Sequence, residues 1–164
     1  MKFDNAVLVL FIRKIGQRKQ VLLAKHHSKA KFGPNKWNGY GGHIEDGETP
    51  TQASVREAKE EAGEGLVFSE SALKAKGVIS FYKHNMEPMC KVRIYLCEDF
   101  AGEAVPTEEM LEPTWFDIDK MPVSEMLPGD KIFMPKILSG KTIHNGWLIF
   151  EENFSGVRGY GGFD

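Results

Sequence analysis

Apolar and β-branched residues gather in short runs along the chain, and turn-forming residues separate the runs. Seven runs have the length and composition of β-strands, and they cover residues 6–13, 20–25, 37–42, 77–82, 91–100, 113–118 and 146–152. Helical spacing of apolar residues occurs over 49–63 and, less clearly, over 130–139. Because strands and helices do not alternate regularly, the pattern argues against a doubly wound sheet. It predicts an α+β fold, an α/β/α sandwich in which helices flank a mixed β-sheet.

The helix expected over 49–63 has clear start and stop signals. Thr49 can cap its first turn, Pro50 suits the first helical position, and Gln52 completes a capping box. Gly63 and Gly65 favour its end, because glycine readily adopts the left-handed conformation found there. Small residues recur at helical spacing and predict a face that packs on a sheet: Thr51, Val55, Ala58 and Ala62.

Glu57, Glu60, Glu61 and Glu64 fall nearly opposite this small-residue stripe. Each like-charged pair one turn apart costs roughly 0.2–0.5 kcal/mol on an exposed helix, so the cluster needs a reason. One interpretation is a solvated acidic face that Arg56 partly neutralises. The other is a site for Mg²⁺ or Mn²⁺, because carboxylate oxygens are the ligands these ions prefer. The charges alone leave both interpretations open.

Composition and length limit the broader class. The chain has 164 residues, 41% hydrophobic and 27% charged, which predicts one globular domain over residues 1–153 and a glycine-rich tail, at most partly ordered, over 154–164. A net charge of −2 does not suggest a stable nucleic-acid partner. Cys90 and Cys97 predict free thiols in a reducing, cytoplasmic setting. The apolar run 6–12 is too short to cross a membrane, and we expect a monomer.

The helix and the loop before it carry a specific motif. Its fixed positions are Gly42, Glu48, Arg56-Glu57-Ala58, Glu60-Glu61 and Gly63. This order resembles the Nudix box, G-x5-E-x7-R-E-U-x-E-E-x-G-U, in which U is aliphatic. Glu64 stands at the last aliphatic position, and we expect Leu66 to replace it as the hydrophobic anchor.

The resemblance implies a Mg²⁺-dependent hydrolase of diphosphate linkages, with Mn²⁺ as a possible substitute. It implies that Glu57, Glu60, Glu61 and the carbonyl of Gly41 hold the metal, and that Arg56 orients the glutamates while Glu48 braces the loop. Glu57 is the first choice for the general base. Glu109, outside the box, is the second choice and a further metal ligand; an exposed turn is the equally open interpretation of Glu109. Phosphate charge agrees with a metal, because carboxylates alone would repel the substrate.

Residues outside the box resemble the branch of this family that hydrolyses oxidised purine nucleoside triphosphates. Phe32 and Asn38 match an aromatic residue and an asparagine that contact the base in that branch. Leu127-Pro128-Gly129-Asp130 stands where the branch has W-P-D-D, so one of two carboxylates is present. The resemblance implies that Phe32, Asn38, Leu127 and Asp130 bind a purine nucleotide such as 8-oxo-dGTP, which is cleaved to the monophosphate and pyrophosphate. A cap for the helix at 130–138 is the alternative role for Asp130.

Two other functions stay open. The chain could cleave a different diphosphate, such as a dinucleotide, ADP-ribose or an RNA 5′ end. It could also bind a nucleotide without hydrolysing it. The four glutamates that the motif retains argue against a module without catalysis.

Overall fold

Nine strands and two α-helices make up residues 2–164, which are the residues that the computed structural model describes. The strands are β1 (Asp4–Ile15), β2 (Arg18–His26), β3 (Trp37–Asn38), β4 (Tyr40–His43), β5 (Leu73–Tyr82), β6 (Pro88–Cys97), β7 (Met110–Asp117), β8 (Ile143–Phe150) and β9 (Val157–Gly161). The helices are α1 (Pro50–Ala62) and α2 (Asp130–Leu138). Short 3₁₀ turns lie between other elements at Glu70–Ala72, Ile118–Lys120, Val123–Glu125 and Glu152–Phe154.

The long strand β1 connects the whole sheet system. Its first half pairs with β6 in parallel and with β4 antiparallel, and its second half pairs with β2 antiparallel. The strand order is β3-β2-β1-β6-β5-β8-β9, with β7 also on β2. Since β1/β6 and β5/β8 are parallel while the other pairs are antiparallel, the predicted mixed sheet is confirmed.

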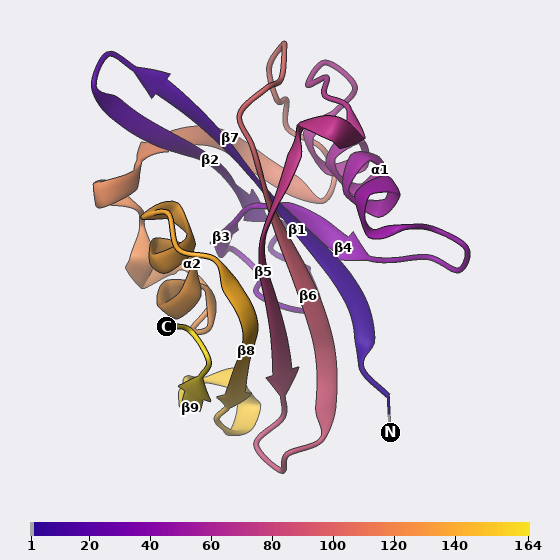
Figure 1. The fold of residues 1–164 in the computed structure, drawn as a ribbon, viewed down its shortest axis with the longest axis vertical. Helices are drawn as coiled ribbons and strands as arrows, with labels where there is room; N and C mark the ends of the chain where they lie inside the picture. Colours follow the sequence, from indigo (N-terminus) through magenta and orange to yellow (C-terminus); the bar gives the residue numbers. More distant parts are fainter. Residues whose placement is uncertain (1) are drawn as a thin grey trace.

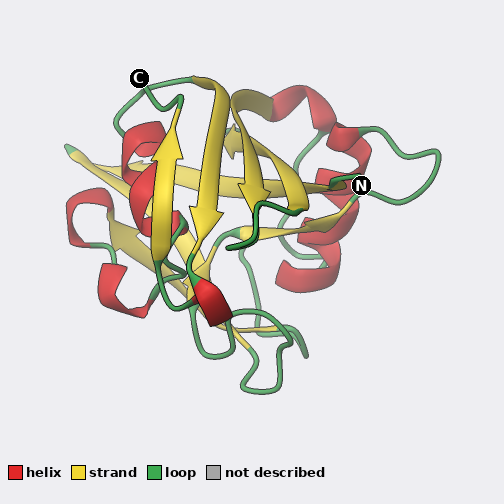
Figure 2. Cartoon of the chain, turned by 90° about the horizontal axis from the view of Figure 1, so that it is seen from below, coloured by secondary structure: helices red, strands yellow, loops and turns green. Residues whose placement is uncertain are grey.

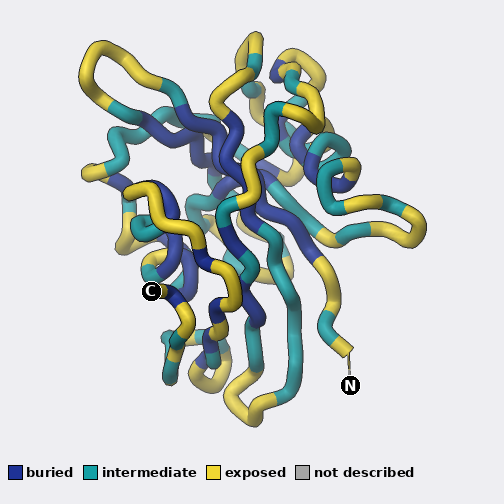
Figure 3. The backbone as a smooth tube through the Cα atoms, in the orientation of Figure 1, coloured by how far each residue is buried: buried dark blue, intermediate teal, exposed yellow. Residues whose placement is uncertain are grey.

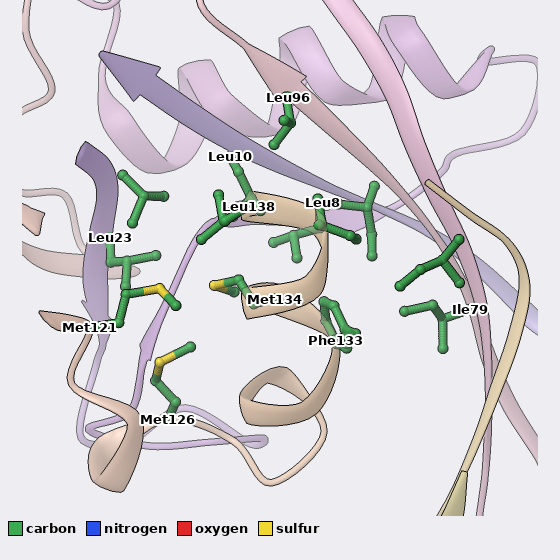
Figure 4. Close-up of a cluster of buried hydrophobic side chains, with 14 of the residues drawn as sticks. Leu8, Leu10, Leu23, Ile79, Leu96, Met121, Met126, Phe133, Met134 and Leu138 are labelled. Carbon is green, nitrogen blue, oxygen red and sulfur yellow. The ribbon is translucent and has the colours of Figure 1, made fainter. Parts of the chain in front are cut away.

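The two helices lie on opposite sides of the strands (Figures 1 and 2). Along β1, Leu8 and Leu10 point into the cluster that includes α2, whereas Val9 and Phe11 point into the cluster beneath α1. Figure 4 shows Leu8 near Phe133 and Leu10 near Leu138, both residues of α2. Burial on both faces explains why β1 has an unbroken apolar run, seen as a dark blue stretch in Figure 3. The predicted α/β/α sandwich is therefore confirmed.

Helix α1 begins as predicted. Thr49 Oγ1 accepts a hydrogen bond from the Gln52 N–H (3.2 Å), and the Gln52 side chain accepts one from the Thr49 N–H (2.9 Å), which closes the capping box. Gly63 ends the helix with a φ of 87°, a conformation that favours glycine. Leu66 is buried, so the expected replacement anchor is confirmed.

The predicted packing face of α1 is only half right, because Ala58 and Ala62 are buried whereas Thr51 and Val55 are half-buried. Its buried positions are Ala53, Ser54, Ala58 and Ala62, so the buried arc is displaced from the predicted stripe. At about 100° per residue, Glu57 and Glu61 fall inside this arc and face β4. Glu64 lies beyond the end of the helix and is exposed, so it does not belong to the acidic face.

Two other expectations also need correction. The strand predicted over 37–42 is interrupted at Gly39, where β3 leaves β2 and β4 joins β1. The tail is ordered rather than loose. Strand β9 pairs antiparallel with β8, and Phe163 after it is 4% exposed. Glycine is depleted in strands, so a glycine-rich segment gives little sign of a strand in sequence.

Candidate functional site

Two glycines of β4 bring the strand close to α1. A Cβ atom on Gly42 would lie 2.5–2.6 Å from the carboxyl group of Glu57, so only glycine leaves room for that side chain. The Gly41 N–H donates a hydrogen bond to Glu61 Oε1 (2.8 Å). The strand therefore holds two box glutamates on the buried side of the helix.

Arg56 joins the loop before α1 to the helix. Its Nε and Nη2 donate to the two carboxylate oxygens of Glu48 (2.7 and 2.9 Å), a bidentate pair with strong geometry. Nη1 donates to Glu57 Oε1 (2.8 Å), and Nη2 donates to the carbonyl of His43 (3.0 Å). The side-chain hydrogen bonds from Arg56, then the N–H of Glu45, lower the pKa of Glu48 to about 2. Arg56 thus contacts both the loop and the helix.

The pKa values of Glu61 and Glu57 are both raised. Burial raises the pKa of Glu61 to about 8, and the hydrogen bond from Gly41 only partly opposes this effect. Burial also raises the pKa of Glu57, with Arg56 acting in the opposite direction. The negative charge of Glu109 raises both pKa values further. A cation would favour the ionised form of each of these groups.

Glu109 reaches the site from the end of the segment that follows β6. Thr107 Oγ1 donates to the carbonyl of Glu61 (2.8 Å), and the N–H of Met110 donates to Thr107 Oγ1 (3.3 Å). The carbonyl of Glu109 accepts from the His27 N–H (3.1 Å). These bonds set the exposed Glu109 carboxylate close to that of Glu61.

The box glutamates differ in exposure. The side chain of Glu60 is 52% exposed and lies 3.4 Å from Arg56 Nη1. Among residues 2–164, no three acidic, histidine or cysteine side chains are gathered tightly enough to hold an ion. Glu57 and Glu61 are therefore the half-buried pair that Arg56 and Gly41 hold by hydrogen bonds, whereas Glu60 and Glu109 are exposed.

A cavity of about 530 Å³ begins at the box and runs between the sheet and α2. Gly41, Gly42 and Glu61 line one part of it, and Asp130 and Phe133 of α2 line another. Its lining is mostly apolar, as in sites that bury a flat ligand. The structure brings all four predicted base-contacting residues to this cavity: Phe32, Asn38, Leu127 and Asp130.

Two polar groups in the cavity have free hydrogen-bonding capacity. Asn38 Oδ1 accepts from the Gly39 N–H (2.8 Å), which leaves the amide NH₂ as a donor. Asp130 is 6% exposed, and its Oδ2 has no partner within the described structure. Burial raises the pKa of Asp130 to about 7. The alternative role for Asp130 is wrong, because Gly129 is the N-cap of α2 and no side chain caps it.

Leu127 and Gly129 shape the cavity differently from a tryptophan and an aspartate. Leu127 packs over Gly33, where a Cβ would lie 2.9 Å from its Cδ2 atom. A Cβ on Gly129 would lie 3.2 Å from Leu148 Cδ1 and 3.6 Å from Phe81 Cε1, which is tight packing. A side chain at 129 would thus press on the core, and Asp130 is the one acid of the pair that this packing accommodates.

His26 lines the same cavity. Its Nδ1–H donates to the carbonyl of Phe32 (3.1 Å), so Nε2 is the nitrogen free to accept. Burial lowers the pKa of His26, which favours the neutral ring. Other cavity residues, Phe81, Cys90, Phe133 and Phe150, come from strands and a helix far apart in sequence, and only the fold reveals them.

Comparison with known proteins identifies the family of this chain. A family model described as the NUDIX domain matches residues 2–137, and the chain belongs to the Nudix family. A Danio rerio protein named oxidized purine nucleoside triphosphate hydrolase is 36% identical over 139 residues, which are 85% of this chain and 83% of the relative. The Mus musculus protein of the same name is 34% identical over 125 residues, 76% of each chain.

Solved structures agree with the fold. The MutT protein from Bacillus halodurans superposes with a TM-score of 0.74 at 20% identity, covering 97% of each chain.

No helix within residues 2–164 has the length and apolar character needed to cross a membrane.

Proposed function

We propose that this chain is a Mg²⁺-dependent hydrolase that cleaves purine nucleoside triphosphates, oxidised purines such as 8-oxo-dGTP among them, to the monophosphate and pyrophosphate. The observation that carries the proposal is the single cavity that connects Asp130 and Asn38 with Glu61. A purine fits at the apolar end, and the phosphates extend to the carboxylates of the box. The names of the zebrafish and mouse relatives support this substrate class.

At the base end, Asn38 and Asp130 read the purine edge. The Asn38 amide donates a hydrogen bond, and Asp130, protonated below about pH 7, offers both a donor and an acceptor. Phe32 and Leu127 cover the faces of the ring system. Because the site has one aspartate rather than two, the proton on Asp130 has no second carboxylate in the motif to which it can move.

At the phosphate end, the donor set suits a hard divalent cation. Nudix hydrolases generally use divalent metals, and half-buried Glu57 and Glu61 have raised pKa values that a nearby cation would lower. Glu57, Glu60, Glu61, Glu109 and the carbonyl of Gly41 would hold Mg²⁺, with Mn²⁺ as an alternative. When bound, the metal supplies charge neutralisation for the phosphates and lowers the pKa of water.

The residues of the chain provide positioning and proton transfer. Arg56 keeps Glu57 at a fixed angle through the 2.8 Å bond and anchors the loop through Glu48. Glu57 accepts the proton of the attacking water, and Glu109 is the alternative base. We also propose that the chain is a monomer in a reducing cytoplasm, a setting in which Cys90 and Cys97 remain free thiols.

The test is pyrophosphate release from a panel of ordinary and oxidised purine and pyrimidine nucleoside triphosphates, with and without Mg²⁺. Glu61→Gln should fold normally and lose at least about 100-fold in turnover, the upper end of losses seen for residues around a metal site. Glu64→Gln is the matched control, because it removes the same charge from an exposed position outside the helix. Metal-independent release, or full activity in Glu61→Gln, would refute the proposal.

The panel also separates the alternatives. Turnover of a dinucleotide, ADP-ribose or an RNA 5′ end in preference to every triphosphate would assign another Nudix substrate. Nucleotide binding with no phosphate release from any substrate would assign a binding module.

A further inference from the structure

Phe32 forms a wall of the cavity, but its own segment gives it little support. It lies in residues 27–36, between β2 and β3, which contain no helix or strand, and it is 39% exposed. Two phenylalanines far away in sequence contact its ring edge to face. The ring centroids are 5.2 Å from Phe154 and 6.2 Å from Phe150, and those two rings are 5.3 Å apart.

Phe154 occupies an unusual backbone conformation. Asn153 and Phe154 have φ values of 60° and 57°, in the left-handed region that bulky residues rarely adopt. Hydrogen bonds hold this conformation, from the Phe154 N–H to the carbonyl of Glu151 (3.1 Å) and from the Glu151 N–H to that of Gly156 (2.8 Å). Such conformations persist where the surrounding structure fixes them, and they are frequent at functional sites.

The C-terminal strand supplies the surrounding structure. Residues 151–156 connect β8 to β9, and β9 pairs with β8 from Trp147↔Gly161 to Phe150↔Val157. The connection is thus anchored at both ends, with Phe154 in its middle. Phe150 lines the cavity, whereas Phe154 stands behind Phe32 and does not.

We propose that Phe154 is a positioning residue that sets the ring of Phe32 for purine binding, so that the C-terminal strand controls base selectivity. The inference rests on the proposed function, because it takes the ligand to be a purine nucleotide. A fixed aromatic wall favours the larger ring system of a purine, since stacking grows with the overlapping aromatic area. A wall that can tilt loses that preference while leaving the phosphate end unchanged.

The test compares kcat and KM for dGTP and dCTP in Phe154→Leu and Phe154→Tyr. Phe154→Leu should raise KM for dGTP about fivefold, in line with the strength of one aromatic pair, with kcat and the dCTP constants nearly unchanged. Phe154→Tyr, which keeps a ring, should restore the wild-type KM. Tyr160→Leu is the control, because this residue belongs to the same segment but is 52% exposed and stacks on Phe163.

A double variant distinguishes positioning from general destabilisation. If Phe154 acts through Phe32, then Phe32→Leu with Phe154→Leu should have the same KM for dGTP as Phe32→Leu alone. Additive effects, or equal losses for dGTP and dCTP, would overturn the proposal. If the wild-type chain hydrolyses no triphosphate, only the proposed function fails, and the same cycle is then measured as dissociation constants for dGMP and dCMP.

Discussion

The protonation of Asp130 should make the stability of the protein depend on pH in a defined way. The group is 6% exposed, its Oδ2 has no partner, and burial raises its pKa from 3.8 to about 7. In the folded chain the acid therefore keeps its proton up to about pH 7, whereas in the unfolded chain it loses the proton above about pH 4. Folding therefore binds a proton in this window. The stabilising contribution of Asp130 is fully present below its unfolded pKa and is lost as the pH rises through its folded pKa.

The magnitude follows from the two pKa values. Between pH 5 and pH 8, the difference in proton binding should lower the free energy of unfolding of the wild-type chain by about 2–3 kcal/mol through this one group. Asp130→Asn has no proton to lose, so it should avoid that change. Relative to wild type, the variant should gain the same about 2–3 kcal/mol in stability when the pH is raised from 5 to 8.

Urea denaturation at pH 5 and pH 8 measures the effect. Asp119→Asn is the control for a change of charge, because Asp119 is exposed on the 3₁₀ turn after β7. A difference between Asp130→Asn and wild type that stays constant across this range would refute the reasoning, since it would mean that Asp130 is already ionised at pH 5. In the same variant, KM for purine substrates should lose its dependence on pH near 7.

Three further variants test other parts of the site. Gly42→Ala places a Cβ against the Glu57 carboxyl and should lower turnover at least about tenfold; wild-type turnover would show that Glu57 moves freely. Asn38→Ala should raise KM for purine substrates about tenfold with little change in kcat, and equal effects on pyrimidines would contradict a base contact. Arg56→Lys should lower the melting temperature, because lysine cannot form the bidentate pair with Glu48. In scanning calorimetry, the difference in melting temperature from wild type should shrink as the pH falls from about 4.5 to about 2, where Glu48 becomes protonated.

The start and end of α1 were predictable because their signals are local. Thr49, Gln52 and Gly63 act on backbone groups within a few residues, so the sequence contains the whole interaction. The Nudix family was recognisable for a similar reason, since the spacing of the box is a property of one loop and one helix. Phe32, Asn38, Leu127 and Asp130 were identified by resemblance, and the cavity gathers all four.

The orientation of α1 was not predictable from its own residues. Its small residues allow two buried arcs, one including Val55 and one including Ala53, and the choice depends on the partner strand. Gly42 of β4 leaves space for the Glu57 carboxylate beneath the helix, and the Gly41 N–H donates to Glu61, which together stabilise the arc that includes Ala53. The burial of Asp130 depends on packing between segments far apart in sequence, and strand β9 was missed because its glycines disfavour a strand prediction.

The bond between Thr107 and Glu61 gives the two acidic parts of the site a common support. Nearby, the Val105 N–H donates to the carbonyl of Ala62 (2.9 Å), so the segment that delivers Glu109 is fastened to the last turn of α1. Fraying of that turn would displace the box glutamate and the distant glutamate together. Residues inserted between Cys97 and Val105 should form an outward bulge and leave the distance between the two carboxylates unchanged. The end of α1 therefore sets the distance between the two carboxylates, and changes in the length of the loop should have little effect on it.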